Sequence, residues 1–182
     1  MFCAALLERM LPNYKMFSDT CEFGDYKLLR NQLDLVWQWL DKDSRCRINT
    51  SAQLAKLELE TPDSEAFDSF GVFPALDVCM GMMSLLQGIQ DKDDDDFLNV
   101  GRLSKNSVSF YVELILAQEK EEQDKTLTTA EEIANHPLMQ WEQATQQELY
   151  DFLKFSAENK RTCDKAKLLV LEEGLSNLGI EI

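Results

Sequence analysis

Residues 70–89 form the most apolar stretch of this 182-residue chain, and they constrain its fold more than any other segment. Gly71 and Pro74 suit the start of a helix, because proline is tolerated in a first helical turn. From Val72 onward, apolar side chains occupy nearly every position around a helical wheel. This pattern is typical of a helix that is buried on all sides. The sequence therefore predicts a buried central helix over residues 72–90.

This stretch is not expected to cross a membrane, because Asp77, Ser84 and Gln87 interrupt it and no apolar run approaches about 18 residues. The first seven residues are also apolar, but they lack the basic start and the cleavage site of a signal peptide. No capping residue precedes them either. We therefore expect that position 1 lies inside a helix whose start is missing from this numbering.

Apolar residues recur at steps of three and four along most of the remaining chain, which predicts further helices. The predicted segments are 2–11 with an apolar face continuing to about residue 21, then 26–41, 50–61, 96–118, 128–136, 137–155 and 161–173. A hydrophilic stretch, 119–126, is expected to close the helix over 96–118. Only the tail, 178–182, alternates with period two, and it is expected to lie extended against the bundle. The sequence thus predicts one all-α domain over residues 1–182, with about eight helices.

Two short helices carry capping signals at their first turns. Thr50-x-x-Gln53 resembles a capping box, in which a side-chain oxygen accepts a hydrogen bond from a free main-chain N–H. Thr128-x-x-Glu131 and Thr129-x-x-Glu132 are alternative boxes for a later helix. These signals place one helix start at residue 50 and the other at residue 128 or 129.

Small residues recur along the predicted central helix and along the helix that follows it. The first stripe consists of Asp77, Gly81, Ser84 and Gly88, and the second of Gly101, Ser104 and Val108. Because small residues let helices approach closely, we expect these two helices to pack as an antiparallel pair. The alternative is that the first stripe lines a small cavity.

Charge and cysteine content narrow the classes of partner and compartment. The net charge of −15 opposes contact with phosphate backbones and anionic lipids, so no nucleic acid and no membrane partner is expected. A basic protein partner or a homo-oligomer remains compatible with this charge. The five cysteines are odd in number and contain no C-x-x-C pair, which argues against a disulfide framework or a zinc ribbon. A reducing cytoplasm is therefore predicted.

No complete catalytic or metal-binding constellation occurs in the sequence. The only histidine, His136, precedes Pro137 at a predicted helix end, where an exposed loop residue is the expectation. Ile133 stands where a di-iron Glu-x-x-His motif needs glutamate. An EF-hand loop starting at Asp91 would place Arg102 where the twelfth position needs glutamate. The sequence therefore predicts no catalytic residue, no cofactor and no metal.

Several segments together resemble the YjaG-like family of bacterial proteins, known as domain-of-unknown-function family 416. These segments are 8–17 (ERMLPNYKMF), 23–25 (FGD), 71–79 (GVFPALDVC) and 176–180 (SNLGI). The similarity extends over essentially the whole chain. It implies a multihelical cytoplasmic protein and brings no catalytic residue to this sequence. It also implies a lead-in helix before the first segment.

Asp77 is the polar residue of greatest interest, because an unpaired carboxylate inside an apolar helix is costly. One interpretation pairs it with Arg9 or Arg30, or with a neighbouring helix end. The other makes it the acid or anchor of a buried site. That candidate pocket comprises Asp77, Glu8, Arg9, Asn13 and Tyr14.

Two hypotheses about function follow from the sequence. The first is a non-enzymatic interaction or adaptor module with an exposed apolar patch that includes Trp39, which lies off the main apolar stripe of its helix. The second is a small-ligand-binding protein or enzyme with a closed, carboxylate-lined pocket around Asp77.

Overall fold

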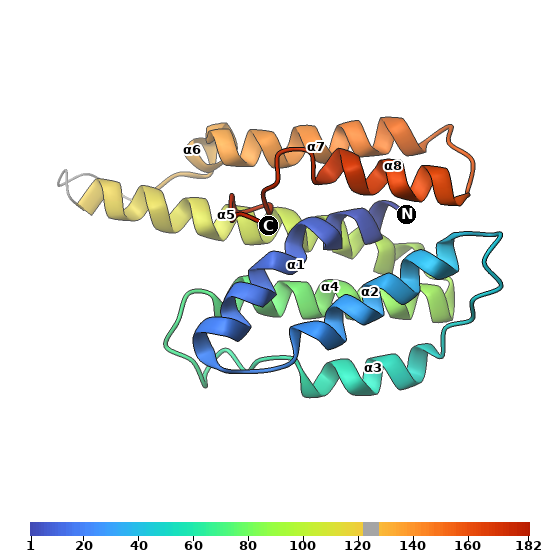
Figure 1. Cartoon of the computed structure of the whole chain (residues 1–182). Coiled ribbons are helices and arrows are strands. Elements are labelled where there is room, and N and C mark those ends of the chain that lie inside the picture. Colours follow the sequence, from blue (N-terminus) through green and yellow to red (C-terminus); the bar gives the residue numbers. More distant parts are fainter. Residues whose placement is uncertain (122–127) are drawn as a thin grey trace.

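The computed structural model describes residues 1–121 and 128–182, and within these residues the chain forms eight helices and no strand (Figure 1). The helices are α1 (Phe2–Cys21), α2 (Tyr26–Leu40), α3 (Thr50–Leu59), α4 (Val72–Asp91), α5 (Asp94–Glu121), α6 (Ala130–Asn135), α7 (Pro137–Leu153) and α8 (Lys160–Val170). This confirms the predicted all-α class. The predicted hydrophilic stretch 119–126 begins as the end of α5, and its remainder lies outside the described residues.

The bundle is organised around α1 as much as around α4. α1 packs against α2, α4, α5, α7 and α8, whereas α4 packs against α1, α3 and α5 (Figure 1). The prediction that α4 is buried on all sides is wrong, because Phe73 and Met80 are 41% and 43% exposed. Among the described residues α4 packs against α1, α3 and α5, and these contacts leave Phe73 and Met80 partly exposed. By length and hydropathy alone α4 could cross a membrane, but 61% of its most apolar window is buried inside the protein.

α4 and α5 form the predicted antiparallel pair. A methyl group added at Gly88 would lie 2.8 Å from the Phe97 ring, while near the other end of α4 the Ser107 hydroxyl donates a 2.6 Å hydrogen bond to Asp77. The small stripe of α4 therefore does permit close approach. The small residues of α5 do not face α4 as predicted. Gly101 faces Phe2 of α1 and Gln146 of α7. Ser104 donates a hydrogen bond to Glu142 of α7. These small residues of α5 admit α1 and α7 instead of α4.

The helix starts follow local side-chain chemistry. α3 is capped by Asn49 and not by the predicted Thr50, because the Asn49 amide oxygen accepts a hydrogen bond from the Ala52 N–H at 3.1 Å. Of the two alternative boxes before α6, the structure forms the one between Thr129 and Glu132. α5 begins at Asp94, two residues earlier than predicted, with three aspartates in its first turn.

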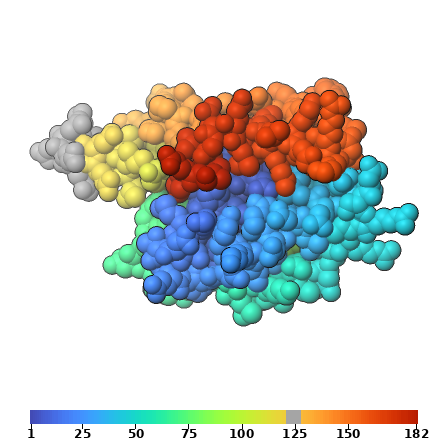
Figure 2. Space-filling view, in the orientation of Figure 1, coloured from blue at the N-terminus to red at the C-terminus, as the bar shows by residue number. Residues whose placement is uncertain are grey.

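The C-terminal tail does not lie extended as predicted but turns back on itself. The Ser176 N–H donates to the Ile180 carbonyl at 2.8 Å, and the Ile182 N–H donates to the Gly174 carbonyl at 3.0 Å. Ser176 and Asn177 become completely buried in this turn. The space-filling view shows the darkest red atoms, which belong to the end of the chain, beside the blue N-terminal part (Figure 2). The two ends of the sequence are therefore joined in one polar layer.

Candidate functional site

Glu8, one of the predicted pocket residues, is held by three side chains from α2 and α8. Arg30 donates to both carboxylate oxygens at 2.5 and 2.8 Å, and the Trp37 indole donates at 2.6 Å. Lys167 lies 3.5 Å away. Arg30 also bonds to Asp34 on its own helix. Glu8 is thus a fully paired carboxylate that ties α1 to α2 and α8, and its partners leave little room for a ligand.

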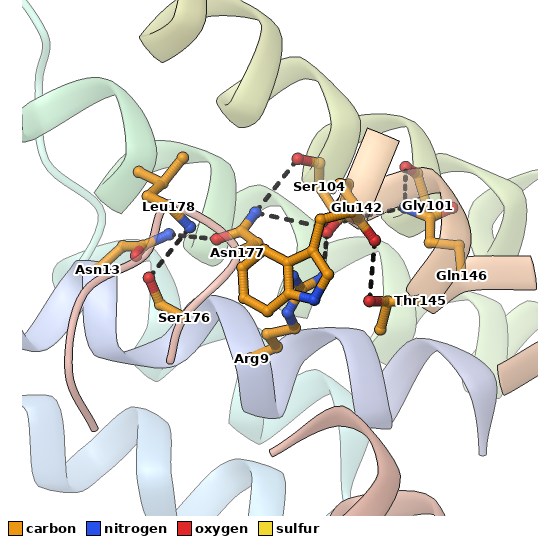
Figure 3. A network of polar contacts seen from close by, with 11 residues as sticks. Arg9, Asn13, Gly101, Ser104, Glu142, Thr145, Gln146, Ser176, Asn177 and Leu178 are labelled. Carbon is orange, nitrogen blue, oxygen red and sulfur yellow. Dashed lines mark hydrogen bonds and ion pairs between the residues drawn. The ribbon is translucent and has the colours of Figure 1, made fainter. Parts of the chain in front are cut away.

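Arg9 forms a buried ion pair with Glu142 of α7 (Figure 3). The side chains are 1% and 0% exposed. Glu142 also accepts hydrogen bonds from Ser104 at 2.6 Å and from Gln146 at 2.7 Å. Burial lowers the pKa of Arg9, and Glu142 opposes this change by stabilising the charged form. The central carbon of the guanidinium lies 3.8 Å from the Trp141 ring centroid, which is a cation–π contact. The Nε and Nη2 atoms of Arg9 have no hydrogen-bond partner among the described residues.

Asn13 connects this pair to the C-terminal turn. Its side-chain amide donates to Oδ1 of the Asn177 side chain at 2.8 Å, while the Asn177 main-chain N–H donates to the Arg9 carbonyl at 3.2 Å. The Asn177 amide in turn donates to the Ser104 carbonyl at 3.2 Å (Figure 3). These contacts link α1, α5, α7 and the tail in one network. Its geometry is that of a structural clamp, and neither Arg9 nor Asn13 lines the clefts described below.

Tyr14 has a separate structural role at the end of α3. Its hydroxyl donates a 2.7 Å hydrogen bond to the Glu60 carbonyl, and burial raises its pKa above the ordinary value. Gly24 lies directly against this hydroxyl with a φ of +72°. The tyrosine therefore fixes the turn between α1 and α2 against α3.

Asp77 is not brought together with the other predicted pocket residues. Arg9 is paired with Glu142 and Arg30 with Glu8 and Asp34, so the predicted ion pair between Asp77 and either arginine is not formed. The closed pocket joining Asp77 to Glu8, Arg9, Asn13 and Tyr14 is likewise absent from the described part of the chain. The physical reason is helical geometry: those four residues lie on α1, while Asp77 points to α5.

Asp77 instead lies in an open cleft of about 340 Å³ between α4 and α5. Its lining residues are Phe73, Pro74, Leu76, Asp77, Asn106, Ser107 and Phe110. Burial raises the pKa of Asp77 from 3.8 to about 6, although the hydrogen bond from Ser107 lowers it. No lysine, arginine or histidine of residues 1–121 and 128–182 forms an ion pair with it. The cleft therefore contains a carboxylate without a cation.

Exposed apolar side chains lie beside this cleft on both helices. We define the α4–α5 apolar face as Phe73, Met80, Phe110 and Leu114, which are 41%, 43%, 41% and 37% exposed. The Phe73 and Phe110 rings meet edge to face with centroids 5.0 Å apart, and Phe110 also stacks on Phe70 at 5.4 Å. Leu114 follows one turn after Phe110 on α5. The Phe73–Phe110 contact therefore joins the two helices within this face.

Trp39 and His136 lie away from this face. Trp39 is 40% exposed and lines a second cleft with Leu40 and Leu153, so its role as an interface residue stays a prediction. His136 caps α7, where its Nδ1 accepts a 3.2 Å hydrogen bond from the Leu138 N–H. In the described ranges, no three or more His, Cys, Asp or Glu side chains are arranged to hold a metal ion. All five cysteines are free.

Sequence reasoning missed Glu142, Ser104 and Asn177, which complete the network around Arg9. A single polar residue on an amphipathic helix is ordinarily assigned to the solvent side. One signal was available for Asn177, because it lies in the closing segment that carried the family resemblance. Nothing in the sequence indicated Ser107 and Asn106 either, which α5 brings beside Asp77.

Replacing Asp77 with asparagine is expected to stabilise the protein at neutral pH. The native state, with the higher carboxyl pKa, binds more protons than the unfolded state between about pH 4 and 6, so Asp77 reduces stability as pH rises through this window. After allowance for the partly open cleft, Asp77→Asn is expected to raise the free energy of unfolding at pH 7 by about 1–2 kcal/mol.

Urea denaturation at pH 5 and pH 7 measures this effect. The gain is expected to be smaller at pH 5, where much of the native carboxyl is already protonated. Asp91→Asn, at the exposed end of the same helix, is the matched control and is expected to change little. A loss of stability in Asp77→Asn at pH 7 would contradict the prediction.

Comparison with known proteins places these features in a family. The chain matches the family "Protein of unknown function (DUF416)" over residues 1–181. It is 33% identical to the uncharacterized protein YjaG of Salmonella typhimurium over 181 residues, covering 98% of this chain and 88% of that relative. An uncharacterized protein of Haemophilus influenzae is 34% identical over 186 residues, or 99% of this chain and 89% of that protein.

A solved structure agrees with the fold. The crystal structure of a DUF416 family protein from Shewanella baltica OS155 superposes with a TM-score of 0.86 at 32% identity. The similarity covers 100% of this chain and 91% of that one. The family match, the identities and the shared helical arrangement all extend over nearly the whole sequence. The chain therefore belongs to the DUF416 family.

Proposed function

We propose that the protein is a non-enzymatic, cytoplasmic interaction module that binds a basic protein partner through the α4–α5 apolar face. The observation that carries this proposal is the face itself: large apolar side chains on two adjacent helices remain exposed beside a carboxylate that has no ion-pair partner among the described residues. Contiguous apolar surface of this kind marks interaction sites in folded proteins. Phenylalanine and methionine are also enriched in the cores of interfaces.

The charge of the chain favours a basic partner over a second copy. At −15, two copies repel each other, whereas a cationic partner is attracted before contact. Asp77 supports the same choice, because a partner that covered the cleft without supplying a cation would bury an unpaired carboxylate. A homo-oligomer is therefore an outcome that the experiment distinguishes.

A site-specific crosslinking experiment tests the proposal. A photoreactive benzoyl-phenylalanine is introduced at Met80 in the bacterium that produces the protein, and separately at Leu168 of α8 as a control. Leu168 is 71% exposed and lies outside the α4–α5 apolar face. We expect an adduct at position 80 but not at position 168, with a crosslinked peptide rich in lysine or arginine.

The affinity of the purified partner then provides the quantitative test. Met80→Gln removes apolar character at nearly constant size and charge, and it is expected to weaken binding at least tenfold. Leu168→Gln is the matched control and is expected to leave the affinity unchanged. Binding of the native chain is expected to weaken as salt increases. Equal adducts at both positions, no adduct, or an adduct of twice the chain mass would overturn the proposal.

A further inference from the structure

We infer that the cleft at Asp77 is a guanidinium-binding subsite that takes an arginine side chain of the partner. This inference rests on the proposed function and names the group that the α4–α5 apolar face recognises. It begins from the Asp77 carboxylate. Oδ2 accepts the hydrogen bond from Ser107, whereas no donor in the described residues reaches Oδ1. Oδ1 is also not among the buried polar atoms without a partner, so it is accessible from the cleft.

The walls of the cleft specify a cation with apolar surface. Phe73, Leu76 and Phe110 line it beside the carboxylate. An anion would meet the charge of Asp77, and an uncharged apolar group would desolvate that charge without pairing it. A cation satisfies the carboxylate and is also attracted by aromatic ring faces. The volume of about 340 Å³ is near the lower limit for small-molecule sites, which suits one side chain.

Asn106 distinguishes arginine from lysine. It lines the same cleft as Asp77, and its side-chain amide forms no hydrogen bond within the described structure. A guanidinium has several donors in a fixed planar fork, so it can donate to the carboxylate and to the Asn106 carbonyl oxygen together. It also stacks on aromatic rings and is weakly hydrated, whereas an ammonium retains its water. The combination of one free carboxylate oxygen, one amide and two rings therefore favours arginine.

Titration of the whole ¹⁵N-labelled chain with single capped amino acids tests this subsite. The probes are N-acetyl-arginine methylamide, its lysine counterpart and its citrulline counterpart, which has the shape of arginine without the charge. We expect saturable shifts of the Asn106 and Ser107 amide signals with arginine. Lysine is expected to bind at least fivefold more weakly, and citrulline is expected to produce no saturable shift.

Two variants connect the signal to the carboxylate. Asp77→Asn is expected to weaken arginine binding at least tenfold, while Asp91→Asn, which removes the same charge from the exposed end of α4, is expected to leave it unchanged. Equal binding of lysine and arginine, shifts spread over other acidic surfaces, or an unchanged affinity in Asp77→Asn would overturn the inference.

The titration and the crosslinking experiment fail independently. If a basic partner crosslinks at position 80 but arginine does not bind the cleft, the proposed function stands and the subsite is wrong. If arginine binds at Asp77 but no partner crosslinks, the subsite stands and the interaction module is wrong.

Discussion

Replacing Glu142 with alanine is expected to lower the free energy of unfolding by about 3–5 kcal/mol, because it leaves the buried Arg9 guanidinium without its counter-ion. Ser104 and Gln146 lose their shared acceptor at the same time. Breaking a buried pair costs more than the pair itself contributes, since the remaining charge stays desolvated. Chemical denaturation followed by circular dichroism measures the loss.

Two further variants separate charge from packing. Glu148→Ala changes an exposed residue on the same helix and is expected to alter stability by less than about 0.5 kcal/mol. The double variant Arg9→Met with Glu142→Leu removes both charges, so it is expected to recover more than half of the loss. A loss below about 1 kcal/mol in Glu142→Ala would show that Arg9 finds another partner or water, contrary to the prediction.

Replacing Gly24 with alanine is expected to lower the free energy of unfolding by about 3 kcal/mol. Two effects add. At a φ of +72° any residue with a Cβ is strained, which costs about 1–2 kcal/mol. The new methyl group would also overlap the Tyr14 hydroxyl, so the hydrogen bond from Tyr14 to the Glu60 carbonyl must break.

Gly174 offers the matched control for this prediction. It has a similar φ of +66°, but no atom lies within 4 Å of the position that its Cβ would occupy. Gly174→Ala is therefore expected to cost only the backbone strain, about 1–2 kcal/mol. Equal losses in the two variants, measured in the same denaturant series, would show that the Tyr14 contact contributes nothing.

The polar clusters of this protein divide into two kinds. The first kind is paired within the bundle and comprises Glu8, Arg9, Asn13 and Tyr14. Replacing a residue of this kind is expected to lower the free energy of unfolding. Asp77 is the second kind, because its removal is expected to increase stability while weakening the binding of a cation. A residue that reduces stability and has no ion-pair partner among the described residues is typical of a binding site.

The helices themselves follow from local sequence. Apolar residues at steps of three and four, together with capping residues and prolines at helix starts, place most of them to within a few residues, because these signals act between neighbours in the chain. α1 is the exception, since it continues through Pro12 to Cys21 as one helix. The net charge and the free cysteines are likewise properties of composition. The family resemblance, carried by four short segments, is confirmed over residues 1–181.

Partner choice between side chains depended on the tertiary arrangement. From the sequence, Asp77, Arg9 and Arg30 appeared equally able to pair, since helical periodicity states which face a residue occupies but not which helix meets that face. Packing directs Arg9 to Glu142, 133 residues away, and leaves Asp77 facing Ser107. The same packing leaves Phe73 and Met80 uncovered, although an apolar wheel alone predicts burial on every side. Local patterns thus determine the helices, whereas the pairing of charges and the exposed α4–α5 apolar face arise only when the helices assemble.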